Sequence, residues 1–172
     1  VLTPLSTSRS PLLAPLFQHA DHLGYLSALR IVPTSSSAHR ECIALVDQLT
    51  AGSLPTWKPC LPVISTSTSR AQTLLLLAAA RLGFAAVWSD VHAVWFQNPL
   101  TIPFFAPRIF GESVDEEELQ QEEQADVAVA GDFHLDFEPR TDVLAVLPTV
   151  AATALLEVWA RWTCTYPFTN SR

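Results

Sequence analysis

The sequence predicts an α/β fold, in which helices flank a sheet of short buried strands. Three observations support this prediction. A helix-forming segment at 69–82 ends at Gly83 and leads through a short turn into the apolar run 84–89. Two more short apolar runs follow this segment, and a further apolar, helix-forming segment comes after them. A helix that feeds directly into a buried strand is the basic unit of α/β proteins.

The N-terminal part predicts an arm, a strand and a helix. Residues 1–17 are rich in Ser, Thr and Pro and contain no acid, which predicts an extended arm. The segment after it begins as a short helical pattern and ends in an expected strand at 29–32, which Pro33 stops. Serines 35–37 then supply an N-cap for a helix with an apolar stripe at helical spacing. The stripe consists of Cys42, Leu45, Val46 and Leu49.

The remaining elements complete a single domain over residues 18–172. A proline-rich loop with a short strand at 61–65 precedes the helix at 69–82 and the strand at 84–89. An acidic insertion at 111–124 is expected to be a solvated loop or an exposed helix. Strands are then expected in 126–133 and 142–149, and a closing helix in 150–162.

The composition excludes several classes of protein. At 172 residues and 49% apolar content, the chain is expected to form one folded domain. Its net charge of −7 argues against binding to nucleic acid. The longest apolar run, 74–88, is interrupted by Arg81 and Gly83 and is shorter than the ~20 residues that span a bilayer. We therefore expect a soluble or peripheral chain with no transmembrane segment.

The three cysteines, at positions 42, 60 and 164, leave two interpretations open. They are widely spaced and form no CxxC motif, which favours three buried thiols over a disulfide framework or a zinc site. One disulfide bridge is also compatible with the spacing.

Asp90 and His92 are the first candidate site. Residues two apart on a strand point to the same face, so the two side chains project together if the strand continues through them. A carboxylate and an imidazole can share a divalent cation or hydrogen-bond to each other. Alternatively, Asp90 caps the following turn and His92 is a half-buried histidine. Polar groups at the carboxyl end of a parallel strand lie where α/β sheets bind ligands.

The segment 125–136 supplies the second set of candidates. Asp132, His134 and Asp136 lie on one face if their segment is extended. If they fold beside Asp90 they can complete a cation site; otherwise they are exposed loop residues.

Residues 81–100, RLGFAAVWSDVHAVWFQNPL, resemble the signature of the nucleotide-diphospho-sugar transferase family that includes the plant cell-wall xylosyl- and arabinosyltransferases. The matching groups are Leu82-Gly83-Phe84, Ser89-Asp90-Val91, Val94-Trp95-Phe96 and Asn98-Pro99-Leu100. Segments 125–133 and 142–162 follow the family's later outline. The resemblance implies a GT-A-like (Rossmann-like) mixed sheet flanked by helices and a nucleotide-sugar donor. It also implies a divalent metal, Mn²⁺ or Mg²⁺, with Asp90 as the first acid of an Asp-x-Asp motif.

Departures from the family pattern change the expected function. His92 replaces the second acid, Arg140 and Asp142 stand where the family has an asparagine and a glycine, and the later motifs of the family do not occur in this chain. We therefore expect an incomplete sheet and a degenerate, non-catalytic domain, without a cofactor, that serves as a scaffold or accessory subunit of a larger protein assembly. The alternative is an active metal-dependent transferase of which this chain is a fragment.

The resemblance also assigns roles and compartments. In a retained site, the metal and the nucleotide sugar contact Asp90, His92 and Asp132, with His134, Asp136 and Trp88 as additional candidates. Trp88 is included as a sugar platform because it directly precedes the motif. The family implies the Golgi or secretory lumen, whereas the acid-free arm is equally compatible with import into a plastid or mitochondrion and removal of a transit peptide.

Overall fold

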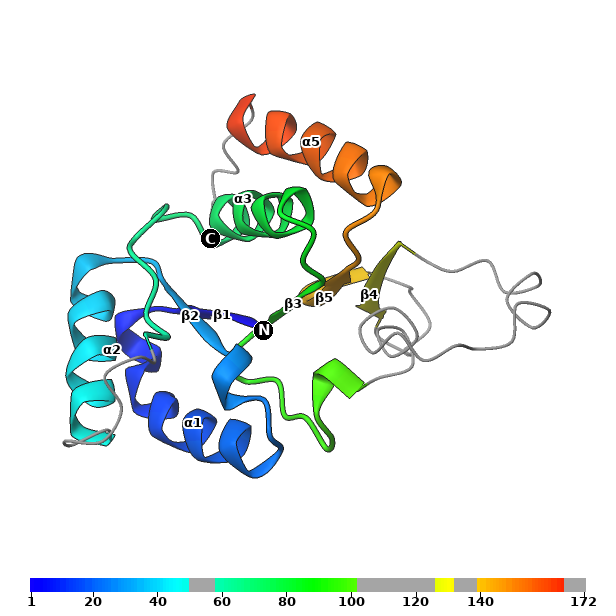
Figure 1. Cartoon of the computed structure of the whole chain (residues 1–172). Coiled ribbons are helices and arrows are strands. Elements are labelled where there is room, and N and C mark those ends of the chain that lie inside the picture. The colour runs from blue at the N-terminus through cyan, green and yellow to red at the C-terminus, as the bar shows by residue number, and fades with distance from the viewer. Residues whose placement is uncertain (50–57, 102–125, 132–138, 166–172) are drawn as a thin grey trace.

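Helices cover both faces of one mixed sheet (Figure 1). The computed structural model describes residues 1–49, 58–101, 126–131 and 139–165. Within these ranges the sheet has five strands in the order β2-β1-β3-β5-β4. The strands are β1 (Leu2–Leu5), β2 (Arg30–Pro33), β3 (Ala86–Ser89), β4 (Val127–Gly131) and β5 (Pro139–Val146). The predicted α/β fold with a mixed sheet flanked by helices is confirmed.

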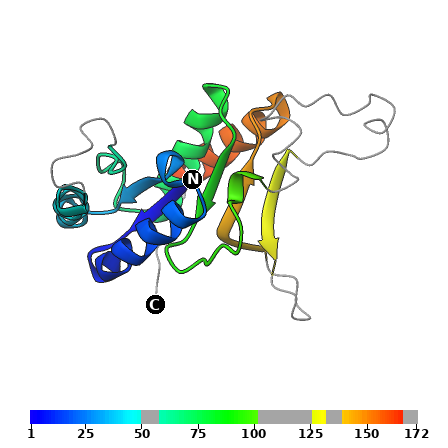
Figure 2. The same ribbon diagram turned by 60° about the horizontal axis from the view of Figure 1, so that its bottom comes forward.

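The strand directions divide the sheet into a parallel and an antiparallel half. β1 pairs in parallel with both β2 and β3, while β5 lies antiparallel between β3 and β4. Figure 2 shows β3, β5 and β4 running side by side in green, orange and yellow. The three parallel strands therefore all end at one edge of the sheet.

The described helices are α1 (Leu13–His22), α2 (Ser36–Leu49), α3 (Thr68–Arg81) and α5 (Val150–Thr165), with short 3₁₀ turns η1 (Thr7–Leu12), η2 (Leu26–Ala28) and η3 (Pro99–Thr101). Three of these helices, α2, α3 and α5, begin where the sequence supplies a capping hydroxyl, whereas α1 follows Leu12 without a side-chain cap. Ser35 Oγ accepts from the Ala38 N–H at 3.1 Å, and Thr149 Oγ1 accepts from the Ala152 N–H at the same distance. The predicted serine cap of α2 is thus confirmed.

The α3–β3 unit follows the prediction closely. Ser67 caps α3, and Gly83 adopts a φ of +80°, a left-handed conformation that ends a helix at little cost for glycine. Arg81 lies exposed at the end of α3, where its Nη2 donates to Glu157 Oε1 of α5 at 2.7 Å. This hydrogen bond and the charge of Arg81 lower the pKa of the Glu157 carboxyl. The pair joins the outer surfaces of two helices whose inner faces pack on the sheet.

Two apolar cores form because neighbouring strand residues point to opposite faces. Ile31 packs with α1 and α2 on one face, and Val32 packs with α3 and α5 on the other. Figure 1 shows the two helix pairs on opposite sides of the sheet. The fully buried Trp88 is the largest side chain of the second core.

Two predictions about the backbone are wrong. Residues 1–17 are not an extended arm, because they form β1, η1 and the first part of α1. β1 is stabilised by strands that follow it by more than 25 residues, which no local pattern reveals. The strand expected at 61–65 is also absent: only Cys60 forms a bridge, to Ile31 of β2, and Pro62 follows two residues later.

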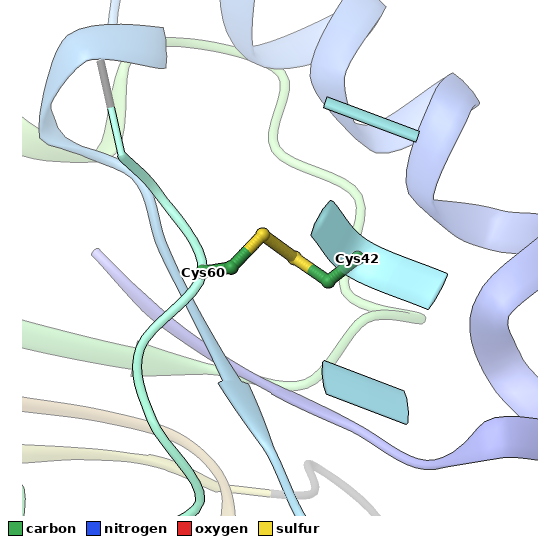
Figure 3. The surroundings of a disulfide bond; sticks show 2 residues. All are labelled: Cys42 and Cys60. Carbon is green, nitrogen blue, oxygen red and sulfur yellow. A yellow bond between two sulfur atoms is a disulfide. The ribbon is translucent and has the colours of Figure 1, made fainter. Parts of the chain in front are cut away.

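A disulfide joins Cys42 of α2 to Cys60 (Figure 3). The expectation of three buried thiols is therefore wrong for this pair, and the bridge left open by the spacing is present. The bridge ties α2 to the segment that pairs with the edge strand β2. Its two cysteines meet because both are placed by β2: Cys42 packs in one core with Ile31, and Cys60 pairs with Ile31, a relation that their spacing of 18 residues does not show.

We predict that reduction of this disulfide lowers the free energy of unfolding by about 3 kcal/mol, the loop entropy expected for a closed loop of this length. Urea denaturation with and without reductant measures the effect. The Cys164→Ala variant is the control, since it should retain the difference. Titration of three free thiols in the non-reduced, unfolded protein would contradict the bridge.

The amino group of Val1 leads to a prediction about pH. It donates to the carbonyl oxygen of Ala28 at 2.9 Å, and burial, followed by the charge of Arg30, lowers its pKa from 8.0 to about 5. Between these values the unfolded chain holds a proton that the folded chain lacks. The free energy of unfolding should therefore fall as the pH falls from 8 to 5, by roughly 4 kcal/mol over the full window.

Urea denaturation at pH 8, 7, 6 and 5 checks this dependence. A chain acetylated at the α-amino group is the control, because it lacks the titrating proton while keeping every side chain. The expected result is a steeper pH dependence in the free-amine chain. Equal slopes in the two chains would show that the amine of Val1 is not desolvated in the folded state.

Candidate functional site

The carboxyl ends of β1, β2 and β3 define the candidate site. In the strand order, β2 is the neighbour of β1 on one side, and β3, the next strand along the chain, is its neighbour on the other side. The strand order therefore reverses at the boundary between β1 and β3. Open α/β sheets bind ligands in the crevice beyond the carboxyl ends of the strands at such a reversal.

Polar residues follow each of these strands. Ser6, Thr7, Ser8 and Arg9 follow β1, Thr34 and Ser35 follow β2, and Asp90 follows β3. The hydroxyl groups bond mainly to one another: Thr7 Oγ1 lies 2.9 Å from Ser37 Oγ, and Ser6 Oγ lies 3.1 Å from Ser8 Oγ. Thr34 instead donates to the carbonyl oxygen of Leu5 at 3.1 Å. The edge is thus lined by internally bonded hydroxyls and two charged groups.

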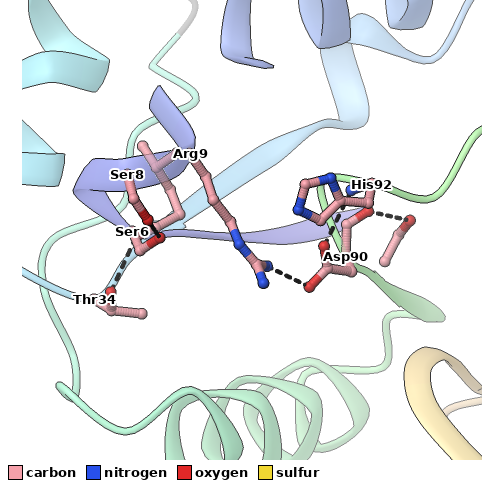
Figure 4. Close-up of polar contacts among 8 residues, drawn as sticks. Ser6, Ser8, Arg9, Thr34, Asp90 and His92 are labelled. Carbon is pink, nitrogen blue, oxygen red and sulfur yellow. Dashed lines mark hydrogen bonds and ion pairs between the residues drawn. The ribbon is translucent and has the colours of Figure 1, made fainter. Parts of the chain in front are cut away.

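The two charged groups are Arg9 and Asp90, and they pair directly (Figure 4). Arg9 Nη1 donates to Asp90 Oδ2 at 2.7 Å, and the side chains are 39% and 21% exposed. Figure 4 shows Arg9 reaching from η1 across to the end of β3. At this exposure the pair contributes up to about 1 kcal/mol to stability. Its larger effect is to supply a positive charge to the carboxylate expected to hold a metal.

The second carboxylate oxygen of Asp90 caps a turn. Oδ1 accepts from the His92 N–H at 3.0 Å, and the Asp90 carbonyl accepts from the Ala93 N–H at 2.9 Å. β3 therefore ends at Ser89, and Asp90 and His92 do not lie on one strand face. The prediction that the two side chains share a strand face is therefore wrong, whereas the alternative that Asp90 caps the following turn is confirmed. His92 is exposed, not half-buried.

The loop that follows Asp90 is held at two points. Trp95 Nε1 donates to Ser89 Oγ at 3.1 Å, and His19 Nε2 of α1 lies 2.7 Å from the Trp95 carbonyl oxygen. Trp95 thus links the end of β3 to α1. The cap at Asp90 and these two contacts fix the path of the chain beside the candidate site.

The other predicted site residues are not brought to Asp90 by the described structure. Trp88 is only 2% exposed and packs among core residues, so its indole cannot present a face to a sugar. That prediction is wrong because residue 88 lies inside the buried strand. Asp132, His134 and Asp136 lie outside the described residues. The expectation that they complete a site remains a prediction.

Asp90 is the one predicted metal ligand that the described ranges place at this edge in a protected position, and both of its oxygens have protein partners. Among the described residues, no group of three or more His, Cys, Asp or Glu side chains could hold a metal ion. At this edge the charge of the Asp90 carboxylate is balanced by Arg9, and the carboxylate is held within the protein.

Sequence reasoning missed Arg9. It is the sole charged residue among residues 1–17, and a lone cation in a Ser- and Pro-rich segment is the signal that could have marked it. Its partner lies 81 residues further along the chain, so the pairing itself has no local signature.

Comparisons with known proteins do not assign this chain to a family. No protein-family model, no curated protein and no solved structure gives a significant match to this chain. Among the helices of the described residues, none is both long and apolar enough to cross a membrane.

We predict a measurable but small coupling between Arg9 and Asp90. A double-mutant cycle with Arg9→Gln and Asp90→Asn keeps the acceptor that caps the His92 N–H and removes only the charges. The coupling in free energy of unfolding should be about 0.5–1 kcal/mol in low salt and smaller in 0.5 M NaCl. Urea denaturation measures all four proteins. A coupling of zero at low salt would mean that the two side chains do not pair in solution.

Proposed function

We propose that this chain is a glycosyltransferase-like domain that has lost its metal site and serves as an accessory or scaffold subunit. The similarity of residues 81–100 to nucleotide-diphospho-sugar transferases and the position of Asp90 at the β1/β3 reversal support a nucleotide-sugar ancestry. The GT-A-like topology belongs to this proposal. One observation carries the loss of function: Arg9 Nη1 lies 2.7 Å from the carboxylate of Asp90.

Charge explains why this contact opposes metal binding. An Asp-x-Asp pair brings two negative charges to a divalent cation and to the diphosphate that the cation neutralises. Here Asp90 supplies one negative charge, Arg9 cancels it, and the imidazole of His92 brings no negative charge. A divalent cation would have to displace a guanidinium and a backbone N–H before it reached the carboxylate. The local arrangement therefore favours an internal ion pair.

The alternative is an active metal-dependent transferase in which Arg9 moves to the diphosphate when the donor binds. The 39% exposure of Arg9 favours this candidate, because a partly exposed guanidinium can change partners. Arginine is well suited to phosphate through its planar fork of donors. The two candidates differ in whether Asp90 becomes free to bind a metal.

The disulfide favours one compartment over the other. Disulfides persist in oxidising compartments and are rare where thiols are kept reduced. The Cys42–Cys60 bridge therefore supports the secretory lumen over a plastid or mitochondrial interior. The exposed apolar side chains of α5, Leu155, Val158 and Trp162, are compatible with a subunit that is covered in an assembly.

Thermal unfolding with Mn²⁺ and uridine or guanosine diphosphate separates the two candidates. A ligand present at 100 times its Kd stabilises a protein by about 2.7 kcal/mol, or roughly 5–10 °C for a domain of this size. We expect a shift below about 1 °C in the wild type, because Asp90 is already paired. Asp90→Asn should behave in the same way, as should Asp21→Asn, an acid on α1 used as the control.

A shift of several degrees that requires both Mn²⁺ and nucleotide, and that is lost in Asp90→Asn but kept in Asp21→Asn, would contradict the non-catalytic proposal. It would establish the metal-dependent alternative. A shift of equal size in all three proteins would place the nucleotide elsewhere and remove Asp90 from both candidates.

A further inference from the structure

A large cavity opens at the amino ends of the parallel strands, opposite the edge that carries Asp90. Its volume is about 880 Å³, within the range of small-molecule sites. It lies between the C-terminal half of α3, the start of β1 and the segment that follows β5. The larger apolar residues around it include Leu75, Leu82, Phe84, Leu100, Leu147 and Pro148.

The apolar character of this cavity follows from the sequence of α3 and the turn after it. Ala78 and Ala79 carry side chains too small to fill the space beside β1. Leu82 is 71% exposed and Phe84 is 65% exposed at the cavity, although both are large apolar residues. Apolar surface of this kind, gathered around a hollow, is a common mark of a binding site.

Among the described residues that line the cavity, Arg30 is the single one with a charged side chain. Its Nη1 donates to the carbonyl oxygens of Ser27 and Leu29 at 2.7 and 2.8 Å, which hold the guanidinium in place without neutralising it. The ion pairs of the described residues, Arg9–Asp90 and Arg81–Glu157, do not include it. Nε and Nη2 of Arg30 therefore remain as charge-assisted donors for a ligand.

The other group at the cavity that could carry charge is the amine of Val1. Its pKa of about 5 leaves it uncharged at neutral pH, so it neither adds to the charge of Arg30 nor neutralises it. The cavity thus combines apolar walls with one positive charge and no acid. The complementary ligand has one negative charge at the end of an apolar body.

We propose that this cavity binds an amphipathic carboxylate, an unbranched acyl chain whose carboxylate pairs with Arg30. The alkyl chain lies along Ala78, Ala79 and Phe84, where burial of its methylene groups is favourable. A planar guanidinium suits a carboxylate because two of its N–H groups can bond to the two oxygens. The proposal is independent of the function proposed for the Asp90 edge.

Isothermal titration of the 172-residue protein with three ligands of equal chain length tests the proposal. The ligands are dodecanoate, dodecanol and dodecylamine, each at pH 7.5 and below its micelle concentration. We expect dodecanoate to bind with one-to-one stoichiometry at least tenfold more tightly than dodecanol, which cannot pair with Arg30. Dodecylamine should bind more weakly still, because its charge is repelled.

Three variants assign the site. Arg30→Gln should weaken dodecanoate at least tenfold and leave dodecanol unchanged. Ala78→Trp, at an exposed position, should fill the cavity and weaken both ligands, and Phe84→Ser should weaken both without adding bulk. Arg70→Gln, on α3 but away from the cavity, is the control and should bind like the wild type.

Several results would overturn the proposal. Equal affinity for dodecanoate and dodecanol would remove the role of Arg30, as would an Arg30→Gln variant with unchanged dodecanoate binding. Binding that survives both Ala78→Trp and Phe84→Ser would place the ligand on another surface. The absence of heat with all three ligands at two well-separated temperatures would show that the cavity takes no acyl chain, since the heat of apolar burial cannot be zero at both.

Discussion

The parallel pairing of β1 with β2 and β3 is the constraint on which the rest of the structure depends. β1 has only four residues, yet its Thr3 and Leu5 are almost completely buried. Its register, Leu2 beside Trp88 and Leu5 beside Pro33, aligns the ends of three strands from distant parts of the chain. β1 is the strand through which β2 joins β3 in the sheet that separates the two apolar cores.

Pro4 shows how closely this pairing is constrained. Proline has no N–H to give to a ladder and is normally excluded from central strands. The pairing of β1 with β3 is confined to Leu2 and Trp88, so it has ended before Pro4 is reached. Beyond that point the chain turns into η1, and this turn is what carries Arg9 over the end of β3.

The ion pair at the carboxyl edge is therefore a consequence of topology as much as of side-chain chemistry. A reversal of strand order opens a crevice in which backbone and side chains can meet a ligand. In this chain the first turn after β1 fills part of that crevice with its own cation. The carboxylate of Asp90 is satisfied by Arg9 on one oxygen and by the His92 N–H on the other. The carboxylate is thus neutralised by a residue of the same fold, and both of its oxygens are occupied by protein donors.

The sequence predicted the elements that local chemistry determines. Ser35 and the apolar stripe around Cys42 specify α2, and Gly83 marks the passage from α3 to β3. The turn cap at Asp90 was likewise one of the predicted alternatives, because an acid at a strand end has N–H groups close at hand. These features depend on residues within one helical turn or one tight turn of each other.

The features that sequence reasoning missed depend on pairing across the chain. β1 resembles a loop when it is considered alone, because its partners are β2 and β3. The Cys42–Cys60 bridge and the contact between Arg9 and Asp90 are products of the same sheet assembly. Trp88 illustrates the opposite error: its neighbours in sequence suggested a ligand, whereas the strand that contains it is buried on both faces.

The two edges of the sheet differ in chemistry and can act separately. One carries hydroxyls and a paired acid, and the other carries a large apolar cavity with Arg30, which forms no ion pair within the described ranges. The chain from Phe84 to Asp90 crosses from one edge to the other, roughly 20 Å at the rise of an extended strand. Substitutions more than about 10 Å apart with no shared partner usually act additively. Arg9 and Arg30 share no partner, so a ligand that fills the apolar cavity need not disturb Asp90. The two proposals, one for each edge of the sheet, can therefore be tested separately.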